Sequence, residues 1–464
     1  MSERDKGIEA KRTGEKSQRV DFRNRIISPP VAGAMDDSAA VISVIISLEE
    51  SADHPERGLQ ESKDQVLKVL KDVHPRSSQF YVFAKLTPKQ ISDLAVTCKQ
   101  WVRHIWKDET CEAHLLQSTV TIQANASWMT FAALGEGITW AVMDTGIQAD
   151  HPHFEMYHSI DAKLSRDFSY PDDPGLEDPL KDQNGHGTFV AGIIAGALKL
   201  APGQTPKATF TTDSATEVKD LAGCPSGVAP KCKLVSIKVL DATGHGDASS
   251  AIQGLEYLRS INAASREIKI DGVNLSLGYP FDPKWFGCGH SPLCEEVNRA
   301  VRAGIVVVVS CGNSGYGQAT LDTGNVVPVS IGLSIADPAN AEEAIAVGSV
   351  HKSSPFTYGI SYFSSKGPTG DGRMKPDLVA PGEKVISCSI DGAENYSYRE
   401  DSGTSMAAPH VSGAIAAYLS VRREFRGHPD KLKEVFKQAA VDLGRDRSFQ
   451  GAGLLDLYRA LTTS

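Results

Sequence analysis

From residue 138 onward, short apolar runs alternate with stretches of helical periodicity, and this alternation limits the folds that the chain can adopt. The apolar runs lie at residues 138–143, 234–240, 273–277, 305–309 and 344–347. Runs this short and this apolar are typical of strands buried on both faces. Helical patterns separate them, at residues 192–200, 248–261, 295–303, 406–422 and 430–440. We therefore predict a three-layer α/β domain with a mainly parallel sheet between two layers of helices.

A different pattern precedes this domain. Residues 36–111 contain, in order, strand, helix, strand, helix and strand patterns, with apolar runs at 41–48 and 80–86. Thr87 is placed to cap the second helix. This order predicts a small α+β domain with its own core. The remaining boundaries are a mobile polar tail at 1–35, a linker or processing junction at 112–127, and the α/β domain at 128–464.

The composition favours a soluble globular protein, with 41% hydrophobic and 23% charged residues. A net charge of −9, from 48 basic and 57 acidic residues, argues against a broad nucleic-acid-binding surface. The first thirty residues lack the apolar core of a signal peptide, and no apolar run is long enough to span a bilayer. Eight cysteines are sparse in 464 residues, so we expect reduced thiols, a cytoplasmic location and no membrane partner.

Three polar motifs stand at the ends of predicted strands or the starts of predicted helices. Asp144 begins an Asp-Thr-Gly motif, His186 lies in Gly-His-Gly-Thr, and Ser405 lies in Gly-Thr-Ser-Met-Ala. Each residue alone is more often a cap or a turn residue. Their joint occurrence favours a catalytic triad, because open α/β sheets present functional residues at the carboxyl ends of strands. Histidine would then take the proton of the nucleophilic serine, and aspartate would orient the histidine.

These motifs resemble the signature motifs of the subtilisin-like serine proteases, the subtilases, in the same Asp, His, Ser order. An α/β-hydrolase would instead present its serine first, within a Gly-x-Ser-x-Gly turn. Segments 227–230, 375–382 and 451–455 also match the family. The resemblance runs from about residue 128 to the C terminus. It implies a serine endopeptidase that hydrolyses peptide bonds in polypeptide substrates through an acyl-enzyme.

Two further segments resemble parts of the family's active site. The Ser-Cys-Gly-Asn sequence at 310–313 is similar to its oxyanion segment, which implies that Asn313 and the amide of Ser405 stabilise the oxyanion. The segment at 274–278 resembles the one on which an extended peptide binds as an added strand. The substrate-binding residues that the resemblance implies are Ser276, Leu277, Gly278, Ser310, Cys311 and Gly312. Side-chain specificity stays open, because the pocket floor depends on the poorly matched residues 316–336.

The domain at 36–111 resembles, more weakly, the propeptide that assists folding of these proteases and then blocks the active site. The resemblance implies a precursor in which the polar stretch after Asp108 enters the cleft and cleavage releases activity. An ordinary accessory domain is the alternative. Two other functions also remain open: a regulatory protein that stays blocked by its own N-terminal domain, and a transamidase in which an amine resolves the acyl-enzyme.

Metal and thiol chemistry receive weaker support. The proposed reaction requires no cofactor, and structural calcium stays open because the predicted surface loop at 201–225 does not match the family's calcium ligands, so no metal residue is predicted. Disulfides or metal binding are alternatives for Cys224 with Cys232 and for Cys288 with Cys294, but neither pair has the C-x-x-C spacing, and reduced thiols are favoured. Phe189 stands where relatives often carry a second histidine, and we expect it to pack behind His186.

Overall fold

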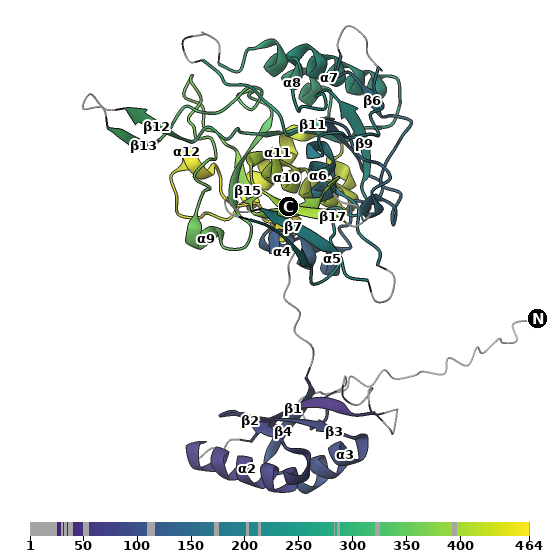
Figure 1. Cartoon of the computed structure of the whole chain (residues 1–464), viewed down its shortest axis with the longest axis vertical. Helices are drawn as coiled ribbons and strands as arrows, with labels where there is room; N and C mark the ends of the chain where they lie inside the picture. Colours follow the sequence, from purple (N-terminus) through teal and green to yellow (C-terminus); the bar gives the residue numbers. More distant parts are fainter. Residues whose placement is uncertain are drawn as a thin grey trace, which may run out of the picture. The chain divides into compact units, whose positions relative to one another are not determined.

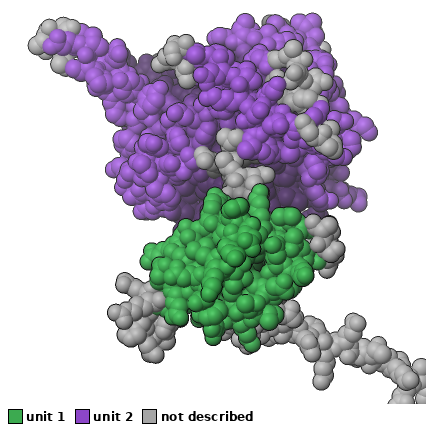
Figure 2. All heavy atoms as spheres, turned by 60° about the horizontal axis from the view of Figure 1, so that its bottom comes forward, with its two compact units in different colours: residues 1–112 green, residues 113–464 purple. Residues whose placement is uncertain are grey.

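The computed structural model describes residues 26–28, 31, 35, 40–49, 55–108, 117–170, 176–200, 204–211, 215–282, 284, 288–320, 325–391 and 397–463. The chain divides into two compact units, Met1–Glu112 and Ala113–Ser464. Figure 2 colours these units separately. Each unit has a hydrophobic core of its own.

The smaller unit is an antiparallel sheet with two helices packed on one face (Figure 1). Its strands follow the order β2-β3-β1-β4: β1 (Ile42–Leu48), β2 (Arg76–Ser77), β3 (Tyr81–Leu86) and β4 (Val102–Lys107). The helices are α2 (Pro55–Val69) and α3 (Pro88–Thr97), with η2 (Lys71–Val73) between α2 and β2. Alternate strand residues such as Val44 and Val82 are fully buried. Thr87 caps α3 in a capping box with Gln90, so the predicted α+β domain is confirmed.

Two segments differ from the boundaries predicted for the tail and the linker. Ile27 pairs with Ile105 at the edge of β4, and Val31 is fully buried, because these apolar residues complete the small core. In the linker region, α4 (Gln117–Thr121) and α5 (Ala124–Phe131) belong to the larger unit. Ile122 between them is fully buried, and its carbonyl accepts a hydrogen bond from Leu457 N at 3.0 Å.

The larger unit contains a seven-stranded sheet in the order β15-β14-β11-β10-β5-β9-β6, with every pairing parallel. The strands are β5 (Thr139–Asp144), β6 (Arg166–Asp167), β9 (Lys233–Lys238), β10 (Gly272–Leu275), β11 (Val306–Ser310), β14 (Ile345–His351) and β15 (Leu378–Glu383). Parallel neighbours require crossover connections, which the helices of this unit supply. The predicted parallel α/β domain is therefore confirmed.

Helices cover both faces of this sheet (Figure 1). One face carries α6 (His186–Ile194), α10 (Thr404–Val421), α11 (Pro429–Ala439) and α13 (Leu457–Thr463); the other carries α7 (Ala248–Ala263) and α8 (Pro292–Arg302). Neighbouring strand residues alternate between the two cores: Val142 packs in the core of α10, whereas Met143 packs in the core of α7 and α8. Shorter helices are η3 (Pro152–Phe154), α9 (Pro355–Tyr358), η4 (Arg423–Phe425) and α12 (Arg447–Gln450).

Two smaller sheets complete the unit. A four-stranded sheet has the order β16-β17-β7-β8, with β7 (Lys207–Thr211), β8 (Thr216–Asp220), β16 (Val385–Cys388) and β17 (Ser397–Asp401). The described part of the predicted loop at 201–225 therefore contains a hairpin, whose β7 pairs with β17. Strands β12 (Tyr316–Thr320) and β13 (Val326–Ser330) form a separate ribbon. Among the helices of the described ranges, none combines the length and hydrophobicity that crossing a membrane requires.

His153 and His410 are almost completely buried in the larger unit. His153 accepts a hydrogen bond at Nδ1 from the Tyr398 hydroxyl at 3.1 Å and donates from Nε2 to Gly192 O at 3.2 Å. His410, in α10, donates from Nδ1 to Met406 O at 2.8 Å. Burial, with a contribution from nearby His151, lowers the pKa of His153 to about 3. Burial lowers the pKa of His410 to about 4, so both rings are neutral in the folded protein near neutral pH.

These two histidines predict acid sensitivity. Between pH 4 and 6.5 the unfolded chain binds their protons and the folded chain does not, so stability rises with pH and falls on acidification. Near pH 5 the pair should lower the free energy of unfolding by about 2–3 kcal/mol per pH unit of acidification. Urea unfolding of the wild type and of His410→Gln at several pH values measures this slope. The variant should lose about half of this contribution, and an unchanged slope would contradict the prediction.

Candidate active site

The residues of the three sequence motifs lie at or beside the carboxyl edge of the seven-stranded sheet. Asp144 is the last residue of β5, His186 is the first residue of α6, and Ser405 is the second residue of α10. Asp144 Oδ1 lies 2.8 Å from His186 Nδ1. The Asp144 side chain is 1% exposed and that of His186 25% exposed, so the carboxylate is enclosed while the ring reaches the surface.

The electrostatics of His186 combine two opposing effects. Burial of the ring favours the neutral form and lowers its pKa, whereas the charge and hydrogen bond of Asp144 raise it. The carboxylates of Asp401 and Asp182 add to the increase, and the net result is a pKa above the ordinary value of 6.5. Because Asp144 accepts the Nδ1 proton, the neutral ring keeps Nε2 free to accept another proton.

Ser405 is held against the segment that follows β10. Its hydroxyl donates to Ser276 O at 3.2 Å, and the Ser276 hydroxyl donates to Ser405 O at 2.8 Å. Ser276 Oγ also accepts from Asn274 Nδ2 at 2.8 Å, and Asn274 Oδ1 accepts from the Ser412 hydroxyl at 2.9 Å. The Ser405 hydroxyl therefore bonds to Ser276 rather than to His186 here. Catalytic hydrogen bonds are often long in free enzymes and shorten when substrate binds.

Asn313 lies in the loop after β11 and faces the start of α10. Its Oδ1 accepts hydrogen bonds from Thr404 N at 2.9 Å and from Thr404 Oγ1 at 3.0 Å. These two donors orient the amide, so that Nδ2 remains available as a donor. A Cβ atom built on Gly403 would lie 3.5 Å from this Nδ2. Gly403 precedes Ser405 by two residues in the sequence, so the donor lies near the start of α10. Thr404 is therefore a positioning residue that the sequence motifs did not single out.

Glycine at position 187 allows the close approach of α6 to the loop after β5. A Cβ atom on Gly187 would lie 2.1 Å from Gly146 O and 3.1 Å from Asp144 Cβ. No side chain fits at that distance unless one of the two backbones moves. The amide of Gly187 also donates to Thr145 Oγ1 at 2.9 Å. The contact between Asp144 and His186 therefore depends on the missing side chain at this position.

This close approach predicts a sharp effect of Gly187→Ala. The added methyl group must push the start of α6 away from Asp144, and displacements of about 1 Å in an active site can cost about 10²-fold in rate. We expect kcat for peptide hydrolysis to fall by about that factor while the protein still folds. Steady-state kinetics and thermal unfolding of both proteins test this, and a variant with unchanged kcat would contradict it.

Asp182 holds the same region together and was missed in the sequence. Its side chain is buried and accepts hydrogen bonds from Thr145 Oγ1 at 2.9 Å, Gly185 N at 2.8 Å and Thr188 Oγ1 at 2.6 Å. It also accepts from the amides of Asn184 and Thr188. The Asp182 carboxylate thus links Thr145, which follows Asp144, to residues that lie before and after His186 in the sequence. An Asp just before a helix start is the sequence signal that could have revealed it.

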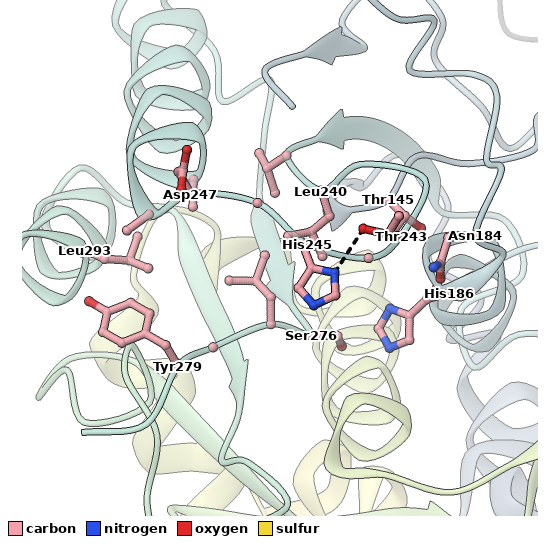
Figure 3. Close-up of a pocket in the computed structure, with 17 residues that line it drawn as sticks. Thr145, Asn184, His186, Leu240, Thr243, His245, Asp247, Ser276, Tyr279 and Leu293 are labelled. Atoms are coloured by element: carbon pink, nitrogen blue, oxygen red, sulfur yellow. Dashed lines mark hydrogen bonds between the residues drawn. The ribbon is translucent and has the colours of Figure 1, made fainter. Parts of the chain in front are cut away.

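Two cavities border these residues and share the segment 276–279. The first, of about 420 Å³, is lined by His186 and by the loop that leads into α7; Figure 3 shows Tyr279 and Leu293 at the end away from His186. The second, of about 460 Å³, reaches Ser405 and Asn313. Its lining also includes residues Ile331, Leu333, Ser334 and Ala336 from the poorly matched stretch.

All but one of the predicted substrate-binding residues line one or both of these cavities. Ser276, Leu277 and Gly278 line both cavities, and Ser310 and Gly312 line the second. Cys311 lines neither, because its side chain points into the core, where its Sγ lies 3.7 Å from Ser364 Oγ. Burial raises the pKa of this thiol to about 12, so it is neutral. The Cys311 side chain therefore lines neither cavity, and a part of Cys311 in substrate binding stays a prediction.

Other expectations concern thiols, metals and Phe189. Seven cysteines of the described residues are free thiols: Cys98, Cys224, Cys232, Cys288, Cys294, Cys311 and Cys388. Within the described ranges, His, Cys, Asp and Glu side chains form no group of three or more that could hold a metal ion. Phe189 is fully buried with Ile193, Val385 and Met406. The Arg399 guanidinium lies 5.4 Å from the centre of its ring.

A parallel sheet whose carboxyl edge gathers an Asp-His pair and a helix-initiating serine is typical of one class of serine hydrolases. A model of the Subtilase family matches residues 135–454, and the chain belongs to that family as a subtilisin-like serine endopeptidase. The chain is 34% identical to the major intracellular serine protease of Bacillus subtilis (strain 168) over 327 residues, which cover 70% of this chain and 82% of that protein.

Two other relatives match a similar or larger share of the chain. Serine protease AprX of Bacillus subtilis (strain 168) is 29% identical over 394 residues, 80% of this chain and 77% of that protein. An intracellular serine protease of Paenibacillus polymyxa is 33% identical over 343 residues, 72% of this chain and 83% of that protein. As a protease of this family, the protein acts on polypeptide substrates.

Proposed function

We propose that Asp144, His186 and Ser405 form the catalytic triad of this protease. The contact that carries the proposal is the 2.8 Å hydrogen bond between the buried Asp144 carboxylate and His186 Nδ1. His186 Nε2 accepts the proton of Ser405 as the serine oxygen attacks the scissile carbonyl carbon, and then delivers it to the leaving amine. Asp144 stabilises the imidazolium that forms between these steps. Water, activated by the same histidine, hydrolyses the acyl-enzyme.

The oxyanion is stabilised in this proposal by Asn313 Nδ2 and the amide of Ser405. The support is the orientation of Asn313, whose Oδ1 is engaged by Thr404 and whose Nδ2 faces the start of α10. The backbone amide of Ser405 lies in the first turn of α10, where backbone amides have no intrahelical acceptor. Every group that this chemistry uses comes from the chain itself, so we propose that it requires no cofactor.

The amide of Asn313 gives a specific prediction. In subtilisin, a member of the same family, loss of the side-chain donor of the oxyanion site lowers kcat by about 10²–10³. We expect Asn313→Ala to show a decrease of that order with a small change in KM, because the donor acts on the transition state. Asn313→Asp is the matched variant, since it keeps the acceptor for Thr404 but removes the donor. Activity retained by Asn313→Asp would contradict the role of Nδ2.

We also propose that the smaller unit is a propeptide that docks on the larger unit. Its sheet has an outer face with aromatic residues: Ile45 pairs with Phe83 on one side and with Trp106 on the other. Tyr81 and Trp106 are 43% and 45% exposed. A small domain that leaves such a face uncovered has a binding surface. The segment predicted to enter the cleft, after Asp108, includes residues 109–116, which lie outside the described residues.

Self-processing of the precursor tests this proposal. Intact mass and N-terminal sequencing of purified wild type should show a cut near residues 109–116, and Ser405→Ala should remain uncut because it lacks the nucleophile. An uncut wild type whose Ser405 reacts with a fluorophosphonate would contradict the propeptide role. An uncut wild type that resists labelling would favour the blocked regulatory protein. Peptide products joined to an added amine would favour the transamidase.

We propose that the protease acts in the cytoplasm. Two relatives that match most of the chain are named intracellular serine proteases. The described cysteines are free thiols, which is the usual state in a reducing compartment. The smaller unit would then keep the protease inactive among cellular proteins until it is cleaved. Fractionation of the producing cells, followed by immunoblotting, would locate the protein.

A further inference from the structure

The ribbon of β12 and β13 projects from the larger unit without a partner sheet (Figure 1). Among the strands of the described residues, β12 and β13 pair only with each other, from Tyr316 opposite Ser330 to Thr320 opposite Val326. None of its residues belongs to a hydrophobic cluster of the described core. Two-stranded ribbons are marginally stable by themselves in water. The projection of this ribbon from the protein is therefore not explained by the stability of the ribbon itself.

The two faces of the ribbon differ in chemistry. Ala319 lies opposite Val327, and Gly317 lies opposite Val329, so these four residues share one face. Ile331 continues that face, since its side chain lies over Gly317. The other face alternates with it and carries the polar residues Gln318, Thr320 and Ser330, together with Tyr316, Val326 and Pro328. We call Ala319, Val327, Val329 and Ile331 the apolar ribbon face.

The root of the ribbon is fixed firmly to the larger unit. The buried ammonium of Lys366 donates to Gly315 O at 2.7 Å and to Ser330 Oγ at 2.9 Å, so it bonds to both strands of the ribbon at its base. The Phe449 ring lies 5.0 Å from the same ammonium. Ile331 N also donates to Gly315 O at 3.0 Å. The ribbon therefore leaves the protein in a defined direction.

The apolar ribbon face leads directly into the proposed substrate cleft. Ile331 ends this face and, with Leu333, lines the 460 Å³ cavity that reaches Ser405. The first strand of the ribbon, β12, begins three residues after Asn313, which lines the same cavity. The cavity and the apolar ribbon face thus share Ile331. The four residues of the apolar ribbon face, Ala319, Val327, Val329 and Ile331, are uncharged and favour an apolar occupant.

We propose that the apolar ribbon face binds an extended, apolar segment of the substrate polypeptide outside the residues that flank the scissile bond. This rests on the proposed function, because the cleft beside Ser405 orients the substrate along the ribbon. An extended chain can satisfy its backbone groups at a free strand edge and pack apolar side chains on the valines. Unfolded proteins supply such segments, whereas a short peptide ends before it reaches the ribbon. The ribbon thus selects long, unfolded substrates.

The test compares Val327→Thr/Val329→Thr with the control Val326→Thr. Threonine keeps the shape and strand preference of valine but removes apolar surface, and Val326 lies on the opposite face. For reduced, carboxymethylated lysozyme, kcat/KM of the double variant should fall about fivefold or more, mainly through KM. For a four-residue chromogenic peptide it should stay unchanged. The control should match the wild type on both substrates.

A binding measurement keeps this inference separate from the proposed chemistry. Ser405 of the processed wild type and of the processed double variant is blocked with a fluorophosphonate, and fluorescence anisotropy with labelled carboxymethylated lysozyme should then show the same weakening of affinity for the double variant. A processed wild type, free of the smaller unit, that is inactive on both substrates would overturn the proposed triad, while the anisotropy would still decide the role of the ribbon. Equal losses on both substrates, or no loss on either, would overturn the ribbon's role. A dimer that the double variant converts to a monomer in sedimentation would also overturn it, since a second copy would occupy the face.

Discussion

The contact between α10 and one face of the parallel sheet is the constraint on which the proposed site depends. Small side chains let this helix approach its neighbours closely: a Cβ atom on Gly413 would lie 2.7 Å from Val228 Cβ, and Ala407, Ala408 and Ala414 are fully buried. Close packing holds the helix in one position, because interiors of this density do not deform gradually. The first turn of α10, with Ser405, therefore emerges at a defined place beside the carboxyl ends of β10 and β11.

Polar contacts then connect the edge of the sheet to the starts of the two helices. Asp182 joins the loop after β5 to the start of α6, and Asn274 with Ser276 joins β10 to α10. Most of these groups are buried, where an unsatisfied hydrogen bond costs more than it does in water. Each partner therefore restricts the other, and the site is held in place by residues that take no part in the proposed chemistry.

Prediction from sequence succeeded for structural features that a few neighbouring residues determine. The apolar runs at 138–143 and 305–309 indicated strands buried on both faces, and Thr87 indicated a helix start. The sequence did not show that the Cys311 side chain points into the core, because a residue next to a site residue can face either way. Prediction missed Asp182, since an Asp before a helix looks like an ordinary cap and only the fold shows that it also bonds to Thr145.

The sequence by itself determined the α/β class, the separate α+β unit and the motifs that contain Asp144, His186 and Ser405. Hydrophobic periodicity and glycine spacing encode these features over a few residues. Only the tertiary structure decided which atoms meet: the 2.8 Å contact of Asp144 with His186, the bond of Ser405 to Ser276, and the ribbon that continues the cleft. These depend on residues far apart in the chain, whose separation is set by the packing of helices on the sheet.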